Sequence, residues 1–158
     1  MPKKTADQWF AEYGESHQNH ANELIHWICV PLIFFSVMGF IWEIPTPAAW
    51  ETSLPWFNWS IVAIVVLTLF YAWIALLLAP GMLIFMTVCQ SIDLRIEMWS
   101  PWPVWKISLI LFVVAWIGQF IGHKLEGRRP SFLQDILFLL IGPAWLLSKI
   151  YRKVGLKY

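Results

Sequence analysis

The sequence predicts an all-α integral membrane protein with about four transmembrane helices, an N-terminal interfacial helix and a kinked or re-entrant C-terminal apolar segment. Two observations predict this fold class. Hydrophobic residues make up 59% of the 158-residue chain and charged residues only 13%, whereas a soluble domain carries roughly 25% charged residues. The apolar residues also gather in runs of membrane-spanning length. We therefore expect a single membrane domain over residues 1–158.

The overall charge and the cysteines exclude some classes of function. The net charge of +1 gives no indication of a nucleic-acid partner. The two cysteines, Cys29 and Cys89, lie inside apolar runs with no second cysteine nearby. They are therefore interpreted as small buried hydrophobic residues rather than as a disulfide or a metal site.

Residues 5–15 are expected to form the interfacial helix. Trp9, Phe10 and Tyr13 recur at helical spacing among charged residues, as in helices that lie in the headgroup region. Gly14 weakens this helix, and the polar residues that follow it favour caps over helix interiors. No early apolar run resembles a cleavable signal peptide, so we expect the N-terminus in the cytoplasm.

The first two membrane spans are expected at residues 24–42 and 61–79. Asn22 is the expected N-cap of the first span, and Pro31 inside it is tolerable where neighbouring helices compensate. The connecting residues 43–59 contain three prolines and no Lys or Arg. They are therefore expected to form a loop on the side of the membrane away from the cytoplasm.

The third and fourth spans are expected at about residues 82–92 and at residues 104–121. A solvated turn should follow the third span because three charged residues occur there, namely Asp93, Arg95 and Glu97. Residues 123–130 are expected to be a polar loop. The final apolar stretch, residues 132–147, is interrupted by Gly142-Pro143, so it is expected to be kinked, re-entrant or surface-lying.

The charge distribution predicts the orientation of these spans. Lys3, Lys4, Lys124 and the basic C-terminal tail should all face the cytoplasm. Four crossings satisfy this bias, whereas a fifth would place the basic tail outside. The twelve Trp residues are interpreted as interfacial anchors. The expected location is a bacterial inner membrane, or the endoplasmic reticulum in a eukaryote.

All four histidines are expected near the same membrane face. His17, His20 and His26 lie where the polar N-terminal segment meets the first apolar run, and His123 follows the fourth run. His17 and His26 are nine positions apart, which places them on opposite faces of a continuous helix, since each residue turns about 100°. They can share a metal only if the helix breaks between them, and the polar residues at 16–22 predict that break.

This cluster predicts a metal site on the cytoplasmic face, with His17, His26 and His123 as the catalytic and metal-binding residues. Glu126, one helical turn after His123, could complete the ligand set or orient it. Such ligands suit Fe(II), Mn or Zn, and two histidines with one carboxylate are typical of non-haem iron oxygenases. His20 is the weakest candidate ligand. The simpler alternative is that each histidine is an interfacial polar residue.

Five further polar residues near the histidines are candidates for binding a substrate. Arg128 and Arg129 could hold an anionic headgroup, although positive charges there would also anchor the cytoplasmic side. Asn19 and Asn22 could face the bundle with His26 or could instead cap a helix. Gln119, inside an apolar run, should face the bundle rather than lipid.

The histidines and their neighbours carry a family resemblance. The chain resembles the membrane-bound 2-hydroxy fatty acid dioxygenases of fungal phytosphingosine breakdown and their bacterial relatives. The matching motifs are Tyr13-x3-His17-x-Asn19-x2-Asn22-x3-His26-x4-Pro31 and Gln119-Phe120-x-Gly122-His123-x2-Glu126-x-Arg128-Arg129-Pro130. His20 departs from the pattern, because the family has a proline there.

The resemblance implies Fe(II)-dependent α-oxidation, in which a 2-hydroxy fatty acid and O2 give the acid one carbon shorter. His17, His26 and His123 match the family's histidines. The balance RCH(OH)COOH + O2 → RCOOH + CO2 + H2O takes all its electrons from the substrate, so no reductase is required. The expected partners are therefore Fe(II), a 2-hydroxy fatty acid, O2 and membrane lipid.

Two rival functions were considered. A membrane di-iron desaturase also has histidines at the ends of its spans but needs about twice as many of them as this chain contains. A small metal- or lipid-handling membrane protein without enzymatic activity remains the alternative. A measurement of bound metal would distinguish this alternative from the enzyme. Only the enzyme requires bound iron, and that iron should be lost when His17 or His123 is replaced.

Overall fold

The chain is all-α in the computed structural model, which describes residues 4–51, 53–127 and 135–158. Those residues contain no strand, which confirms the predicted helical class. The helices are α1 (Ala6–Gly14), α2 (His20–Trp42), α3 (Ala48–Glu51), α4 (Trp59–Ile74), α5 (Ala79–Trp99), α6 (Val104–Glu126) and α7 (Asp135–Lys153).

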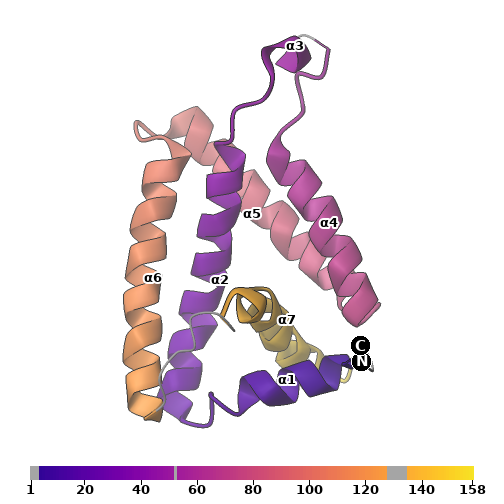
Figure 1. Ribbon diagram of the computed structural model, residues 1–158, viewed down its shortest axis with the longest axis vertical. Helices are drawn as coiled ribbons and strands as arrows, with labels where there is room; N and C mark the ends of the chain where they lie inside the picture. Colours follow the sequence, from indigo (N-terminus) through magenta and orange to yellow (C-terminus); the bar gives the residue numbers. More distant parts are fainter. Residues whose placement is uncertain (1–3, 52, 128–134) are drawn as a thin grey trace.

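Helices α2 and α6 run side by side along the long axis of the molecule (Figure 1). Helices α4 and α5 form a second pair that packs against α2. At the end of the molecule opposite α3, α1 lies across the long axis and α7 is seen nearly end-on (Figure 1). Because α7 packs on both α1 and α2, α1 and α7 lie together beside the lower part of α2, on the side away from α6 (Figure 1).

Small residues allow α2 and α6 to pack closely. A Cβ atom on Gly118 would lie 2.5 Å from the Cys29 sulfur, and one on Gly122 would lie 2.3 Å from the Asn22 side-chain oxygen. Cys29, Ile33 and Ala115 form the small apolar core between the two helices. This packing brings the start of α2 next to the end of α6, where the candidate ligands lie.

The predicted helix break between His17 and His26 is confirmed. α1 begins with a capping box formed by Thr5 and Gln8, and it ends at Gly14. α2 begins at His20, with the Asn19 side chain accepting hydrogen bonds from the amides of Ala21 and Asn22. The prediction that Asn22 caps this helix is therefore wrong, because the helix starts earlier and Asn22 is fully buried inside its first turn.

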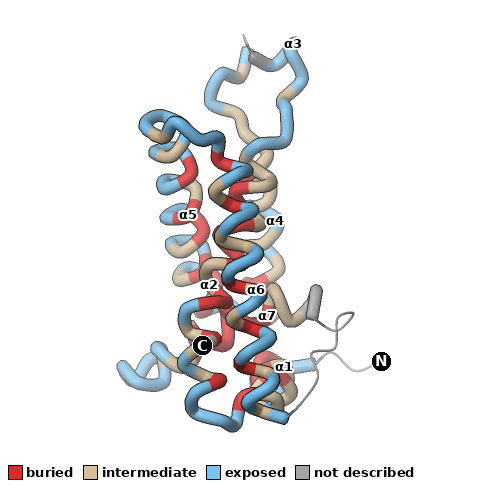
Figure 2. Tube along the Cα trace, turned by 90° about the vertical axis from the view of Figure 1, so that its left-hand side faces the viewer, coloured by how far each residue is buried: buried red, intermediate tan, exposed pale blue. Residues whose placement is uncertain are grey.

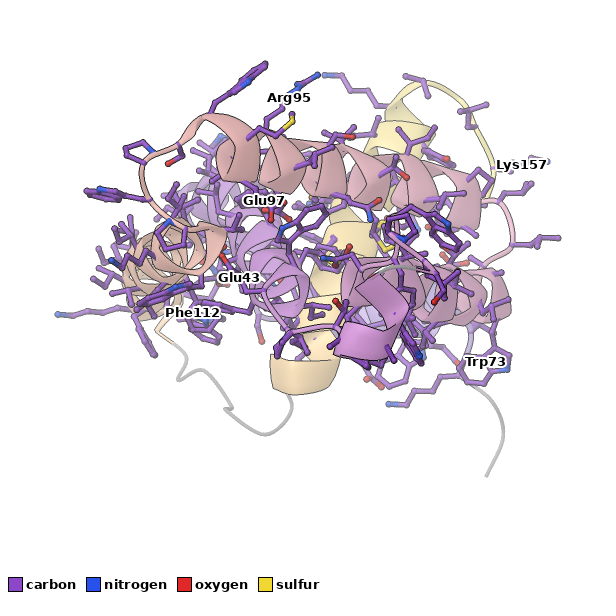
Figure 3. The ribbon with its side chains drawn as sticks, turned by 90° about the horizontal axis from the view of Figure 1, so that it is seen from above. Glu43, Trp73, Arg95, Glu97, Phe112 and Lys157 are labelled. Atoms are coloured by element: carbon purple, nitrogen blue, oxygen red, sulfur yellow. The ribbon has the colours of Figure 1, made fainter. Side chains whose placement is uncertain are left out.

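The middle of the chain differs from the predicted spans. α4 ends at Ile74 rather than near residue 79, and α5 continues to Trp99. The predicted solvated turn at Asp93, Arg95 and Glu97 is wrong, because all three lie within α5. Arg95 and Glu97 are exposed and Asp93 is fully buried. Figure 3 shows Arg95 at the outer edge of α5, pointing away from the other helices.

The ends of α6 and α7 also differ from the prediction. α6 continues through His123 to Glu126 and ends at Gly127, whose left-handed φ of 72° suits a glycine C-cap. The polar loop therefore begins after His123 rather than at it. α7 is a single helix that contains Pro143, so no helix end lies at the predicted interruption.

Two of the described helices, α2 and α6, are long and apolar enough to cross a membrane. α4 is apolar but shorter. Many large apolar side chains on the outer faces of α4, α5 and α6 are exposed, and the exposed residues are distributed along the whole length of the bundle (Figure 2).

Candidate metal centre

Three histidines from distant parts of the chain meet where the start of α2 lies beside the end of α6. His17 comes from the segment between α1 and α2, His26 from the second turn of α2, and His123 from the last turn of α6. Their ring centroids are 4.1 Å apart for His17 and His26, 5.1 Å for His26 and His123, and 5.6 Å for His17 and His123. One ring nitrogen from each lies within 4.8 Å of the others.

Backbone carbonyls determine which nitrogen of two histidines is available to a ligand. His17 Nδ1 lies 2.6 Å from the Tyr13 carbonyl oxygen, and His26 Nδ1 lies 2.8 Å from that of Asn22. A carbonyl oxygen only accepts, so each Nδ1 carries the proton and donates it. Each Nε2 therefore keeps its lone pair, which is the tautomer that a metal-binding histidine needs.

One ring nitrogen of each of the three histidines lacks a hydrogen-bond partner among the described residues. These atoms are His17 Nε2, His26 Nε2 and His123 Nδ1, and all three are buried. Buried polar atoms are nearly always paired, so three orphans facing a common space require an explanation. A metal ion bound by the three imidazoles would satisfy all three nitrogens, and the rings would move closer around it because metal–nitrogen bonds are about 2.0–2.1 Å long.

Aromatic rings enclose His17. Tyr13 stacks on its imidazole at 4.3 Å, with only 13° between the ring planes. Trp145, from α7, lies against it at 5.4 Å. Burial, together with a smaller effect of the nearby His123, lowers the pKa of His17 to about 4. His17 is therefore a neutral imidazole at neutral pH, as a metal ligand must be.

Glu126 is not part of the histidine cluster, although it was predicted as a possible ligand. Its carboxylate accepts hydrogen bonds from the backbone amides of Gln18 and Asn19, both at 2.9 Å. It also accepts one from the Asn22 side-chain amide at 2.9 Å. Glu126 thus ties the segment that carries His17 to the end of the helix that carries His123, so it orients the ligands from outside the set.

The other predicted site residues have different outcomes. His20, predicted as the weakest ligand, is exposed and lies outside the cluster of three histidines. Asn19 is a helix cap, while Asn22 is buried beside His26 and connects Ser16 to Glu126. Gln119 is buried one turn before His123, as expected for a bundle-facing residue. Arg128 and Arg129 lie outside the described residues.

Sequence reasoning missed the contribution of α7. Lys149 was interpreted as part of a basic tail, yet its ammonium lies 3.8 Å from the centre of the Trp145 ring and 2.6 Å from the Glu23 carboxylate. The i, i+4 spacing of Trp145 and Lys149 would have indicated a shared helix face. It could not indicate that this face meets His17.

Comparisons with known proteins identify the family of this chain. Residues 3–154 match the family described as 2-hydroxy-palmitic acid dioxygenase Mpo1-like. The chain is also 30% identical to the 2-hydroxy-palmitic acid dioxygenase MPO1 of Saccharomyces cerevisiae over 147 residues, which cover 90% of this chain and 78% of the yeast protein. No solved structure matches it significantly. The chain therefore belongs to the Mpo1-like family of 2-hydroxy-palmitic acid dioxygenases.

Proposed function

We propose that this chain is an Fe(II)-dependent dioxygenase that converts 2-hydroxy fatty acids to the acid one carbon shorter. The observation that carries the proposal is the set of three buried imidazole nitrogens without partners, in a chain of the Mpo1-like family. His17, His26 and His123 would hold the iron. Fe(II) bound there would supply the redox chemistry that allows O2 to react with the acid.

The remaining residues prepare the site. The carbonyls of Tyr13 and Asn22 fix two ligand tautomers, and Glu126 fixes the position of the segment that carries His17. The rings of Tyr13 and Trp145 cover His17 and keep bulk water from it. The overall reaction, RCH(OH)COOH + O2 → RCOOH + CO2 + H2O, is balanced without an added reductant.

The proposed location is a membrane, with the site on its cytoplasmic face. The many exposed Leu, Ile, Val and Trp side chains on the outer faces of α4, α5 and α6 support this location, because soluble monomers rarely expose such large apolar surfaces. A fatty acid dissolved in the same lipid would reach the site without entering water.

The test is product analysis with the full chain. Protein purified without oxygen and loaded with Fe(II) is mixed with O2 and 2-hydroxypalmitate, and the products are identified by mass spectrometry. We expect pentadecanoate and CO2 in equal amounts. His17→Ala, His26→Ala and His123→Ala should lose both iron and product, whereas the exposed His20→Ala should retain both.

Two results would contradict the proposal. Unchanged 2-hydroxypalmitate in the presence of bound iron would exclude the reaction. Zinc as the bound metal, with no product formed by any metal form, would favour a metal- or lipid-handling protein without enzymatic activity.

A further inference from the structure

An apolar pocket lies next to the histidine cluster, where α2, α5 and α7 meet. Its volume is about 140 Å³. Apolar side chains from all three helices line it, among them Trp27, Pro31, Phe85, Pro143, Leu146 and Ile150. Trp27 follows the candidate ligand His26 in the chain, and Leu146 follows Trp145, whose ring contacts His17.

A partly buried ion pair borders this pocket on the side of the histidines. Lys149 lies on α7 between the pocket residues Leu146 and Ile150. Its ammonium contacts the Glu23 carboxylate at 2.6 Å, and the same carboxylate accepts a hydrogen bond from the Trp27 indole at 3.4 Å. Both charged side chains are only about one-third exposed, at 32% for Lys149 and 28% for Glu23.

Lys149 also lies close to the candidate metal ligands. The Trp145 ring contacts the Lys149 ammonium and the His17 imidazole, so a single side chain separates the two. The positive charge of Lys149 is one of the influences that lower the pKa of His17. The Glu23 carboxylate thus lies beside the Lys149 ammonium, between an apolar pocket and the three histidines. The carboxylate of a fatty acid would suit the same place, because the ammonium can donate to it.

We propose that Lys149 binds the carboxylate of the 2-hydroxy fatty acid and that the pocket between α2, α5 and α7 takes the first part of its acyl chain. This inference rests on the proposed function, because the substrate is the one proposed there. When the substrate binds, its carboxylate replaces the Glu23 carboxylate as the partner of the Lys149 ammonium. The hydroxyl-bearing carbon joins the substrate carboxylate to the acyl chain, so it lies between Lys149 and the pocket, with the Trp145 ring between Lys149 and His17.

The first experiment measures binding without catalysis. The metal-free full chain in detergent is titrated with radiolabelled 2-hydroxypalmitate and with its methyl ester. Lys149→Gln should weaken binding of the acid by roughly tenfold or more, the usual effect of losing a hydrogen bond to a charged group. It should leave binding of the ester unchanged. Lys153→Gln, which removes an exposed lysine one turn further along α7, is the matched control.

Glu23→Gln distinguishes carboxylate binding from a purely structural ion pair. This change removes the group that competes for Lys149, so the acid should bind as tightly as to the unaltered chain or more tightly. If the pair serves only to hold α2 against α7, Glu23→Gln and Lys149→Gln should weaken binding of both the acid and the ester alike. That result would overturn the proposal.

A second experiment locates the acyl chain. A 2-hydroxy fatty acid carrying a diazirine near its head is photolysed with the metal-free chain, and the labelled peptides are identified by mass spectrometry. We expect labels on Phe85 of α5 and on residues 143–150 of α7, with unlabelled 2-hydroxypalmitate competing. Ile150→Trp should abolish the α7 label, whereas Val154→Trp, an exposed change outside the pocket, should not. Labels confined to α4 or to the outer face of α6 would overturn the proposal.

These measurements separate the inference from the proposed function. Suppose that the chain oxidises 2-hydroxypalmitate, is labelled elsewhere, and binds the acid normally after Lys149→Gln. The proposed function would then stand, and this binding mode would be wrong. A chain that forms no product but shows the expected labels and Lys149 dependence is instead a fatty-acid-binding protein with this pocket.

Discussion

At the scale of single residues, the position of His17 depends on one carboxylate. His17 lies in the segment between α1 and α2, and the Glu126 carboxylate ties this segment to α6 by accepting hydrogen bonds from two backbone amides and from Asn22. The negative charge makes all three of these hydrogen bonds stronger than neutral ones. A change at Glu126 should therefore act on the metal through the position of His17.

We predict that Glu126→Gln weakens iron binding by roughly tenfold, the lower end of the effect of residues that orient metal ligands. The glutamine side chain has only one oxygen that can accept. Its NH2 group would face one of the backbone N–H groups that now donate to the Glu126 carboxylate. Iron affinity is measured by competition with a chelator, with the exposed Glu15→Gln as control. Equal affinities for both variants would show that Glu126 does not position the ligands.

The approach of His17 to His26 could be predicted from sequence because its constraint is local, whereas His123 was placed near them only through the order and orientation of the predicted spans. A nine-residue spacing with polar cap formers between requires a break, and the break is present between Gly14 and His20. Lys149 and Trp145 could not be predicted, because their role depends on how α7 crosses α1 and α2. The sequence did not show that His20 lies outside the cluster, because proximity along the chain to His17 and His26 does not determine which way a side chain points.

At the scale of helices, the contact between α2 and α6 brings the three histidines together, and Gly122 is a point of close approach beside them. A methyl group there would lie 2.3 Å from the Asn22 oxygen and 3.4 Å from the His26 ring. Gly14 offers a contrast, because a methyl group there would meet only Trp145, at an ordinary 3.7 Å.

We predict that Gly122→Ala lowers the free energy of unfolding by roughly 1–3 kcal/mol, as overpacking of a tight contact does. It should also weaken iron binding, since Asn22 is held between Glu126 and Ser16. Gly14→Ala should leave both properties close to those of the unaltered chain. Thermal unfolding and iron titration check this, and a Gly122→Ala variant as stable as Gly14→Ala would contradict the packing described.

Helix α5 contains a polar residue with no evident partner. Asp93 is fully buried, and both of its carboxylate oxygens lack a hydrogen-bond partner among the described residues. An unpaired buried carboxylate is costly, whereas a neutral amide of the same shape costs less. The charge pattern predicted a turn here because sequence alone does not reveal that α5 continues and buries one of its three charged residues.

We predict that Asp93→Asn stabilises the chain by about 1 kcal/mol, which raises the melting temperature by roughly 2–4 °C. Glu97→Gln, an exposed change one turn further along α5, should have no effect. Thermal unfolding in detergent measures both variants. A lower melting temperature for Asp93→Asn would mean that the carboxylate has a partner and contributes to stability.

At the scale of the whole molecule, the two ends of the long axis differ in the helices and the charged residues that they contain. The histidines, α1 and α7 lie at one end, and the loop that contains α3 lies at the other (Figure 1). At the α3 end the Glu43 carboxylate accepts a hydrogen bond from the Trp105 amide, and Figure 3 shows the Glu43 region from above. The sequence predicted this polarity from its charges, since residues 43–59 contain no Lys or Arg.

This polarity predicts a membrane topology that chemical labelling can test. With α7 lying across the bundle rather than along it (Figure 1), the C-terminal tail stays at the histidine end, which the positive charges place in the cytoplasm. Ser53, in the α3 loop, should then face the opposite side. Both Ser53 and Lys157 are exposed, and the native Cys29 and Cys89 are buried.

In intact bacterial cells, a membrane-impermeant maleimide should therefore label Ser53→Cys and leave Lys157→Cys unlabelled. After permeabilisation it should label both, which controls for the reactivity of each position. Labelling of both positions in intact cells would mean that α7 crosses the membrane and that the tail leaves the histidine side. Because α7 supplies Trp145 and Lys149 beside His17, that result would also contradict the contact between α7 and the candidate metal centre.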